Sequence, residues 1–196
     1  MSTTAHESPQ ARGRALAALA VFALAVLPFL GALQAGFLNW DDRGTLLDHE
    51  AWRGFTPAHL SWMATSFHMG HHMPLTWLSW AVDWSIWGLD PFGFHLTNVV
   101  LHGVNAVLVF FLAERLLALT TKLEPRRVRL GAVFAALFFA VHPLRAESVA
   151  WITERRDVLS CAFLLGAVLA YLRACEVDVR CRTPMVEFPG GRGAPP

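Results

Sequence analysis

Long apolar runs alternate with polar stretches along the chain and predict an all-α, polytopic membrane protein with about four transmembrane helices. The first run, Ala15–Leu33, has 19 residues and no charge, close to the roughly 20 that a spanning helix needs. Pro28 lies late in this run and is expected to kink the helix. A cleaved signal peptide is the rival interpretation of the same run.

Three further apolar runs follow. Asn98–Leu119 is long enough to span a bilayer, and its His102 and Asn105 lie one turn apart on a face that should pack inside the bundle. Leu130–Val141 has only 12 residues, so it either spans with help from its flanks or forms half of a hairpin. Val158–Leu172 is the fourth predicted crossing.

The distribution of basic residues predicts the orientation. Residues 1–14 and the loop Lys122–Arg129 are rich in Arg and are expected on the cytoplasmic side. The loops 34–97 and 142–157 then lie on the outer side, periplasmic or lumenal, and hold all eight Trp. The tail 173–196 has no apolar period and ends in Pro and Gly, so we expect it to be disordered and cytoplasmic.

Composition supports a multi-pass integral membrane protein in contact with the lipid bilayer. Hydrophobic residues make up 55% of the 196 residues, and charged residues make up 16%, against about 25% in soluble domains. A net charge of +1 provides no basic footprint for nucleic acid, so none is expected as a partner. Three cysteines without metal-site spacing are too few for a disulfide framework.

Within the first outer loop, Pro74–Leu89 reads as a helix with Pro at its first position. Four Trp form one stripe of this helix and aliphatic residues form another, with Asp83 between them. We expect an interfacial helix that packs its aliphatic stripe on protein and places the Trp rings among lipid headgroups. A transmembrane helix is the alternative.

Two adjacent carboxylates, Asp41 and Asp42, come directly after the first helix. Such a pair at a membrane surface suits a general base or a cation ligand, and a solvated helix cap is the simpler alternative. His68–His72 contains three imidazoles but matches no strong zinc pattern. We therefore predict no metal site and no cofactor, although a divalent metal stays open.

The second outer loop concentrates charge between apolar helices. Arg155 and Arg156 lie in it, against the charge bias of an outer loop, which indicates an anionic partner such as a phosphate group. Headgroup anchoring with internal Glu–Arg pairing is the alternative.

Five motifs in this order resemble the N-terminal membrane part of the TMTC-type family, transmembrane proteins with C-terminal tetratricopeptide repeats. That family is similar to protein O-mannosyltransferases and has a GT-C-like glycosyltransferase fold. The resemblance covers about residues 15–172. The motifs are Phe37-Leu-Asn-Trp-Asp-Asp42, Pro74-Leu-Thr-Trp-Leu-Ser79, Gly93-Phe-His-Leu-Thr-Asn-Val-Val-Leu-His102, His142-Pro-Leu-Arg-Ala-Glu-Ser-Val-Ala-Trp151 and Glu154-Arg-Arg-Asp-Val-Leu-Ser160.

The resemblance implies transfer of a sugar from a polyprenyl-phosphate donor to a hydroxyl of a protein or glycan acceptor on the outer side. Asp41 or Asp42 would act as the base or hold the acceptor. Arg155 and Arg156 would stabilise the leaving phosphate, and we expect one of the two Asp to pair with them across the loops. Further site candidates are His142 and Glu147, which match the family's His-Pro and Glu motif, and Asp157 and His102.

The chain also departs from the family. His72-Met73 stands where the pattern has Trp-His, four spans are fewer than a GT-C enzyme has, and no 34-residue repeat is present. We therefore expect a truncated, partial GT-C-like fold and leave open whether it acts alone. The alternatives are a non-catalytic membrane module that binds lipid phosphate or partner helices, and a small transporter subunit.

Overall fold

The computed structural model describes residues 9–181, in which the backbone is helical apart from loops and one isolated bridge between His68 and His71. This confirms the predicted all-α class. The elements in chain order are α1 (Pro9–Val26), η1 (Leu27–Gln34), η2 (Arg43–Leu47), α2 (Pro57–Thr65), α3 (Pro74–Trp87), α4 (Pro91–Thr120), α5 (Pro125–Ala140), α6 (Arg145–Ala150), η3 (Ile152–Glu154) and α7 (Arg155–Cys181).

The first apolar segment changes its helix type near Pro28. The α-helical part, α1, ends at Val26, and η1 continues as a 3-10 helix, because proline has no N–H for the α-helical bond and its ring crowds the preceding turn. Val21 and Ala25 are fully buried against the neighbouring helices. The segment is therefore an integral part of the bundle.

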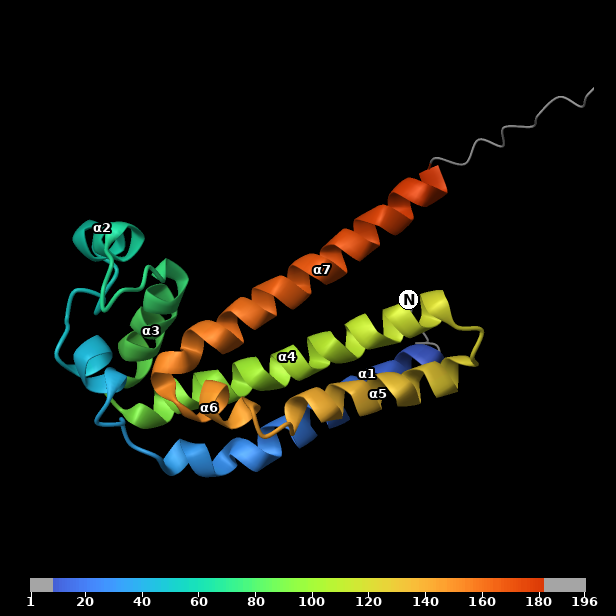
Figure 1. The fold of residues 1–196 in the computed structure, drawn as a ribbon, viewed down its shortest axis with the longest axis horizontal. Coiled ribbons are helices and arrows are strands. Elements are labelled where there is room, and N and C mark those ends of the chain that lie inside the picture. Colours follow the sequence, from blue (N-terminus) through green and yellow to red (C-terminus); the bar gives the residue numbers. More distant parts are fainter. Residues whose placement is uncertain (1–8, 182–196) are drawn as a thin grey trace, which may run out of the picture.

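The centre of the molecule is a bundle of α1, α4 and α5, while α7 starts beside α4 and diverges from it along its length (Figure 1). The core between α1, α4 and α5 is built largely from alanine, including Ala106, Ala132 and Ala136. Small side chains let helix backbones approach closely, which is the usual packing mode inside a membrane.

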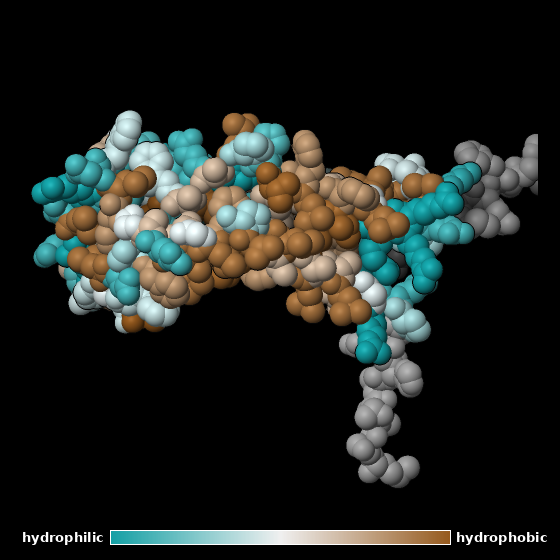
Figure 2. Space-filling model, turned by 90° about the horizontal axis from the view of Figure 1, so that it is seen from below, coloured by the Kyte–Doolittle hydropathy of each residue, from teal (hydrophilic) through white to brown (hydrophobic). Residues whose placement is uncertain are grey.

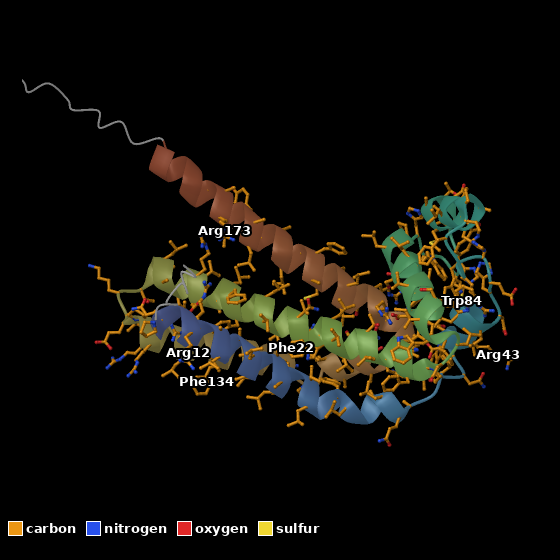
Figure 3. The ribbon with its side chains drawn as sticks, turned by 180° about the vertical axis from the view of Figure 1, so that it is seen from behind. Arg12, Phe22, Arg43, Trp84, Phe134 and Arg173 are labelled. Atoms are coloured by element: carbon orange, nitrogen blue, oxygen red, sulfur yellow. The ribbon has the colours of Figure 1, made fainter. Side chains whose placement is uncertain are left out.

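The surface divides into three zones, and Figure 2 shows an apolar middle between two hydrophilic ends. One end, here the loop end, is formed by η2, α2, α3, α6 and η3. The other, the basic end, is formed by the first turns of α1 and α5 and the last turns of α4 and α7. Phe134 of α5 points outward from the middle zone (Figure 3) and is 75% exposed, as expected for a side chain that contacts lipid.

Three helical segments among the described residues are long and apolar enough to cross a membrane: Pro9–Gln34, Pro91–Thr120 and Ile152–Cys175. The fourth predicted crossing corresponds to α5, which has 16 residues and is about 24 Å long at 1.5 Å per residue. A hydrocarbon core is about 30 Å thick, so α5 alone is short of a full crossing. Beyond it, α6 and η3 carry the chain on to the loop end.

Several helices begin earlier or end later than the predicted apolar segments. Asp90 caps α4 by accepting a hydrogen bond from the Phe92 N–H at 3.0 Å, so this helix begins at Pro91, ahead of the apolar run predicted from Asn98. Most of the basic stretch 122–129 belongs to α5. The last helix runs through Cys181, so the predicted disordered tail begins inside α7; residues 182–196 lie outside the described part.

The predicted helix Pro74–Leu89 is confirmed as α3, but its orientation is reversed. Trp77 and Trp80 are fully buried, whereas Leu75 and Ile86 are 54% and 66% exposed. The indole rings pack edge-to-face against one another and against the aromatic side chains of α2 and the first loop. Aromatic rings bury more apolar area than aliphatic side chains, so Trp77 and Trp80 form the core, Trp84 packs against it and the aliphatic stripe faces outward, while Trp87 at the end of the helix is 40% exposed.

Candidate functional site

Asp42 connects the first loop to the second. Its Oδ1 accepts hydrogen bonds from Trp151 Nε1 at 2.9 Å, from the Thr153 backbone N–H at 3.2 Å and from the Thr153 hydroxyl. Its Oδ2 accepts from the Leu38 N–H at 2.8 Å. The side chain is fully buried, so this carboxylate acts as an anchor between two segments that lie 111 residues apart.

Arg155 forms a second buried junction, between α7, α3 and α4. Its Nη2 donates to Asp83 Oδ2 at 2.7 Å and to the Phe94 carbonyl at 2.8 Å. Its Nε donates to Asn98 Oδ1, and Nη1 lies 3.3 Å from the Ser79 hydroxyl. A buried guanidinium requires this degree of neutralisation and hydrogen bonding.

The two junctions change the predicted site. Asp42 and Arg155 do lie on connected segments, because Asp42 binds Thr153 two residues before Arg155. They do not pair, however, since the carboxylate is occupied by neutral donors and the guanidinium is occupied by Asp83. The guanidinium of Arg155 is also fully buried, so in this arrangement it does not face a lipid phosphate.

Asp41, the neighbour of the anchor, is placed differently. Its side chain is half-buried, and within the described part of the chain it takes part in no hydrogen bond or ion pair. The adjacent Trp40 is exposed and packs edge-on against Trp151 at 6.2 Å between centroids. Asp41 is therefore the carboxylate of the pair that can reach a bound molecule.

Arg156 lies at the start of α7 beside an apolar cavity of about 390 Å³. Its side chain is 33% exposed and binds Glu154 through both Nη2 (2.7 Å) and Nε (3.3 Å). Because Glu154 binds only the Nε–Nη2 edge of the Arg156 guanidinium, the remaining N–H groups can still donate to a ligand. The cavity is lined by Met73, Pro74, Leu75, Thr76, Arg156, Leu159, Ser160 and Phe163.

The remaining candidates are dispersed. His142 is half-buried, packs on Phe138 and accepts a hydrogen bond from the Leu144 N–H at 3.3 Å. Glu147 is exposed on α6. Asp157 is exposed and accepts from the Ser148 hydroxyl at 3.0 Å.

His102 is buried at the contact of α4 with α5, where its Nε2 lies 3.0 Å from the Ala140 carbonyl. Asn105, one turn further along α4, donates to the Val158 carbonyl at 2.8 Å. This confirms that the polar face of the second apolar run packs inside the bundle. Both side chains satisfy the carbonyls of neighbouring helices, which have no water to bond inside a membrane.

The histidine-rich stretch forms a tight turn. His68 lies 3.1 Å from the Gly44 carbonyl through Nε2, and His72 lies 2.9 Å from the Ala64 carbonyl. His68 also stacks on His49 at 4.3 Å between centroids, and burial together with the charges of His68 and Arg53 lowers the pKa of His49. Among residues 9–181, no three His, Cys, Asp or Glu side chains are grouped as a metal would require.

Sequence reasoning missed Asp83 and Asn98 as members of the central network. Asp83 was noted only as a charge between two apolar stripes, although a carboxylate within such a helix signals a buried partner. Asn98 precedes His102 by four residues and Asn105 by seven, so the three share one face of α4. That polar stripe was the sequence signal that could have identified Asn98 as a member of the buried network.

The chain is similar to curated protein O-mannosyl-transferases. It is 38% identical over 159 residues to Protein O-mannosyl-transferase Tmtc1 of Drosophila melanogaster, a match that covers 77% of this chain and 17% of the relative. It is 36% identical over 160 residues to Tmtc2 of the same organism, covering 76% and 16%. Human TMTC4 is 28% identical over 171 residues, covering 81% and 23%.

The chain thus spans between about a sixth and a quarter of the length of these relatives. No protein-family model and no solved structure matches it.

Proposed function

Since this chain belongs to the TMTC family of protein O-mannosyl-transferases, we propose that it carries the acceptor-activating and donor-phosphate groups of a membrane glycosyltransferase. The reaction is transfer of a sugar, mannose by the names of the relatives, from a polyprenyl-phosphate donor to a hydroxyl of a protein acceptor. The observation that carries the proposal is the different environment of the two carboxylates, since Asp42 is buried and hydrogen-bonded whereas Asp41 is accessible. The anchored Asp42 holds its accessible neighbour Asp41 at the loop end.

In the proposed step, Asp41 accepts the proton of the acceptor hydroxyl while the hydroxyl oxygen attacks the anomeric carbon of the sugar. The bond between this carbon and the phosphate oxygen breaks, and polyprenyl phosphate leaves with the electron pair. A phosphate is a good leaving group, so the protein has to stabilise its charge and has little need of an acid.

Arg156 and the adjoining cavity suit the donor. The guanidinium offers a planar fork for phosphate oxygens, and the cavity wall beside it is apolar, with Leu75, Leu159 and Phe163. An isoprenoid chain requires such a wall next to its phosphate. The role first given to both arginines therefore falls to Arg156, while Arg155 positions the start of α7.

A lipid-phosphate-binding module without catalysis is the second candidate. It is favoured by the internal bonding of Asp42 and Arg155, because both side chains are engaged within the protein. Both candidate functions require lipid phosphate to bind at Arg156, but only the transferase requires Asp41 as a base.

Donor binding and transfer, measured together, separate the two candidates. Polyprenyl-phosphate mannose is titrated into membranes that contain the chain, with quenching of Trp fluorescence as the binding signal and labelled mannose as the transfer signal. Arg156→Gln is expected to weaken donor binding about tenfold or more, as for a charge-assisted contact, while the matched control Arg43→Gln, an exposed Arg of the same end, leaves it unchanged. Donor binding without sugar transfer would support the non-catalytic lipid-phosphate-binding module. Normal donor binding by Arg156→Gln would contradict the proposed donor site at Arg156.

The charges at the two ends support the proposed orientation, with the basic end cytoplasmic and the loop end outside. Single cysteines in an otherwise cysteine-free chain, at His71 in the exposed turn and at Lys122 between α4 and α5, test it. A membrane-impermeant maleimide added to sealed cells or vesicles of known sidedness should label His71→Cys and spare Lys122→Cys until the membrane is opened. The reverse pattern would place Asp41 on the cytoplasmic side.

A further inference from the structure

The basic end contains two adjoining cavities that the proposed transfer reaction does not use. The larger one, of about 540 Å³, lies between α1, α4 and α5. The smaller one, of about 310 Å³, lies between α1, α4 and α7. Arg14 and Arg115 line both cavities, so the two lie side by side in the region where the bundle meets the diverging helix α7.

The lining of this region is strongly cationic. Arg129 joins Arg14 and Arg115 in the larger cavity, and Arg173 of α7 joins them in the smaller one. Figure 3 shows Arg12 and Arg173 at this same end, far from Arg43 and Trp84. Glu114 lines the larger cavity and lies 2.6 Å from Arg14 and 3.7 Å from Arg129.

The excess of positive charge extends beyond the cavity linings to the neighbouring described side chains of the basic end. Between residues 9 and 175, eight basic side chains gather there against two acidic ones. The basic residues are Arg12, Arg14, Arg115, Lys122, Arg126, Arg127, Arg129 and Arg173, and the acidic residues are Glu114 and Glu124.

The smaller cavity is also apolar on one side. Phe111 of α4 and Leu169 of α7 form its inner wall, and the Arg14 guanidinium stacks 4.8 Å above the Phe111 ring. A ligand for this region therefore needs an anionic group at the level of the arginines and a hydrocarbon part along the helices. A soluble anion provides the anionic group but not the hydrocarbon part.

We propose that the Arg14–Arg115–Arg173 cavity at the basic end binds the phosphate of an anionic phospholipid, with an acyl chain lying between α4 and α7. Arginine binds phosphate oxygens through two donors at once, and basic pockets between transmembrane helices are suited to anionic lipid headgroups. The bound lipid places its phosphate against this cationic lining and its acyl chain in the space that opens where α7 leaves α4. This site lies at the opposite end from Asp41 and Arg156 and does not depend on the proposed transfer reaction.

Native mass spectrometry of the complete 196-residue chain tests the proposal. The protein is released from detergent micelles that contain equimolar phosphatidylglycerol and phosphatidylcholine, and retained lipid is counted. Phosphatidylglycerol is expected to predominate. Arg173→Gln, at an exposed position, should lower its retention about fivefold, the scale of one basic residue near an anionic lipid surface, and Arg115→Gln/Arg173→Gln should lower it further.

The matched control is Arg12→Gln/Arg127→Gln, which removes the same charge from exposed positions that line none of these cavities. It should retain phosphatidylglycerol as the unchanged protein does. Equal retention of both lipids, or equal loss in the control, would overturn the site in favour of diffuse charge attraction. Displacement of the lipid by glycerol 3-phosphate at the same phosphate concentration would overturn the lipid assignment, because phosphate alone would then suffice.

Discussion

Arg155 Nη2 lies 2.7 Å from Asp83 Oδ2, and this ion pair joins α7 to α3 across 72 residues of sequence. Both side chains are removed from solvent, and Asp83 also accepts a hydrogen bond from the Thr97 hydroxyl at 2.7 Å. Asn98 completes the network by accepting from Arg155 and donating to the Trp151 carbonyl. The first turn of α7, which carries Arg156, is therefore held by polar contacts with α3 and α4.

The pair should behave as a coupled unit. Asp83→Asn or Arg155→Met alone leaves an uncompensated buried charge and should lower the free energy of unfolding by about 3–5 kcal/mol. The double variant removes both charges, so it should cost clearly less than the sum of the two single variants. Denaturation in detergent, followed by Trp fluorescence, measures the cycle. Additive costs would show that the two side chains do not interact.

The reversed orientation of α3 gives a second prediction. Trp80→Ala should lower the free energy of unfolding by about 3–5 kcal/mol, the usual cost of removing a large buried ring. Ile86→Ala, on the exposed stripe of the same helix, should change it by no more than about 0.5 kcal/mol. The same denaturation assay checks both variants. A larger loss for Ile86→Ala than for Trp80→Ala would restore the orientation that the sequence pattern indicated.

The sequence predicted the elements of the bundle well, because apolar length and charge are local properties. The Pro28 transition, the start of α3 at Pro74 and the inward face of His102 were all visible in the pattern. The side of α3 that is buried was not visible, since both stripes are apolar and only the aromatic partners in other segments decide between them. Trp52 and Trp62, which lie outside α3 and pack against Trp80 and Trp77, determine that side.

The sequence indicated which two loops lie together but not which side chains pair within them. Motif order indicated that the loops around Asp42 and Arg155 belong together, and Asp42 does contact Thr153. The partner of Arg155 could not be derived from its own loop, because Asp83 comes from a helix 72 residues earlier. The placement of both loops on one side of the membrane favoured the Asp41–Asp42 motif as the partner, whereas the structure pairs Arg155 with the buried Asp83 beside the Trp core.

The pH dependence of the loop end should reflect His49. Burial, the neighbouring charges of His68 and Arg53, and the resulting lowered pKa keep its imidazole neutral in the folded protein. As the pH falls below about 6.5, the unfolded chain takes up a proton that the folded chain does not, so stability decreases.

The free energy of unfolding, measured between pH 7.5 and pH 5, should therefore decline toward acid, and His49→Gln should make the decline shallower. His71→Gln is the control, since His71 is exposed in the turn. An unchanged slope in His49→Gln would mean that His49 does not titrate differently on folding.

The transfer activity of Asp41→Asn, normalised to folded protein in the membrane, tests the proposed function most directly. Asp41 should be the base and Asp42 the anchor, so Asp41→Asn should lower turnover about 10²-fold or more with unchanged unfolding, and the exposed-acid control Asp48→Asn should retain full turnover. Asp42→Ala, which leaves buried donors on Trp151, Thr153 and Leu38 without their acceptor, should instead lower stability. Normal transfer by folded Asp41→Asn would contradict the proposed mechanism.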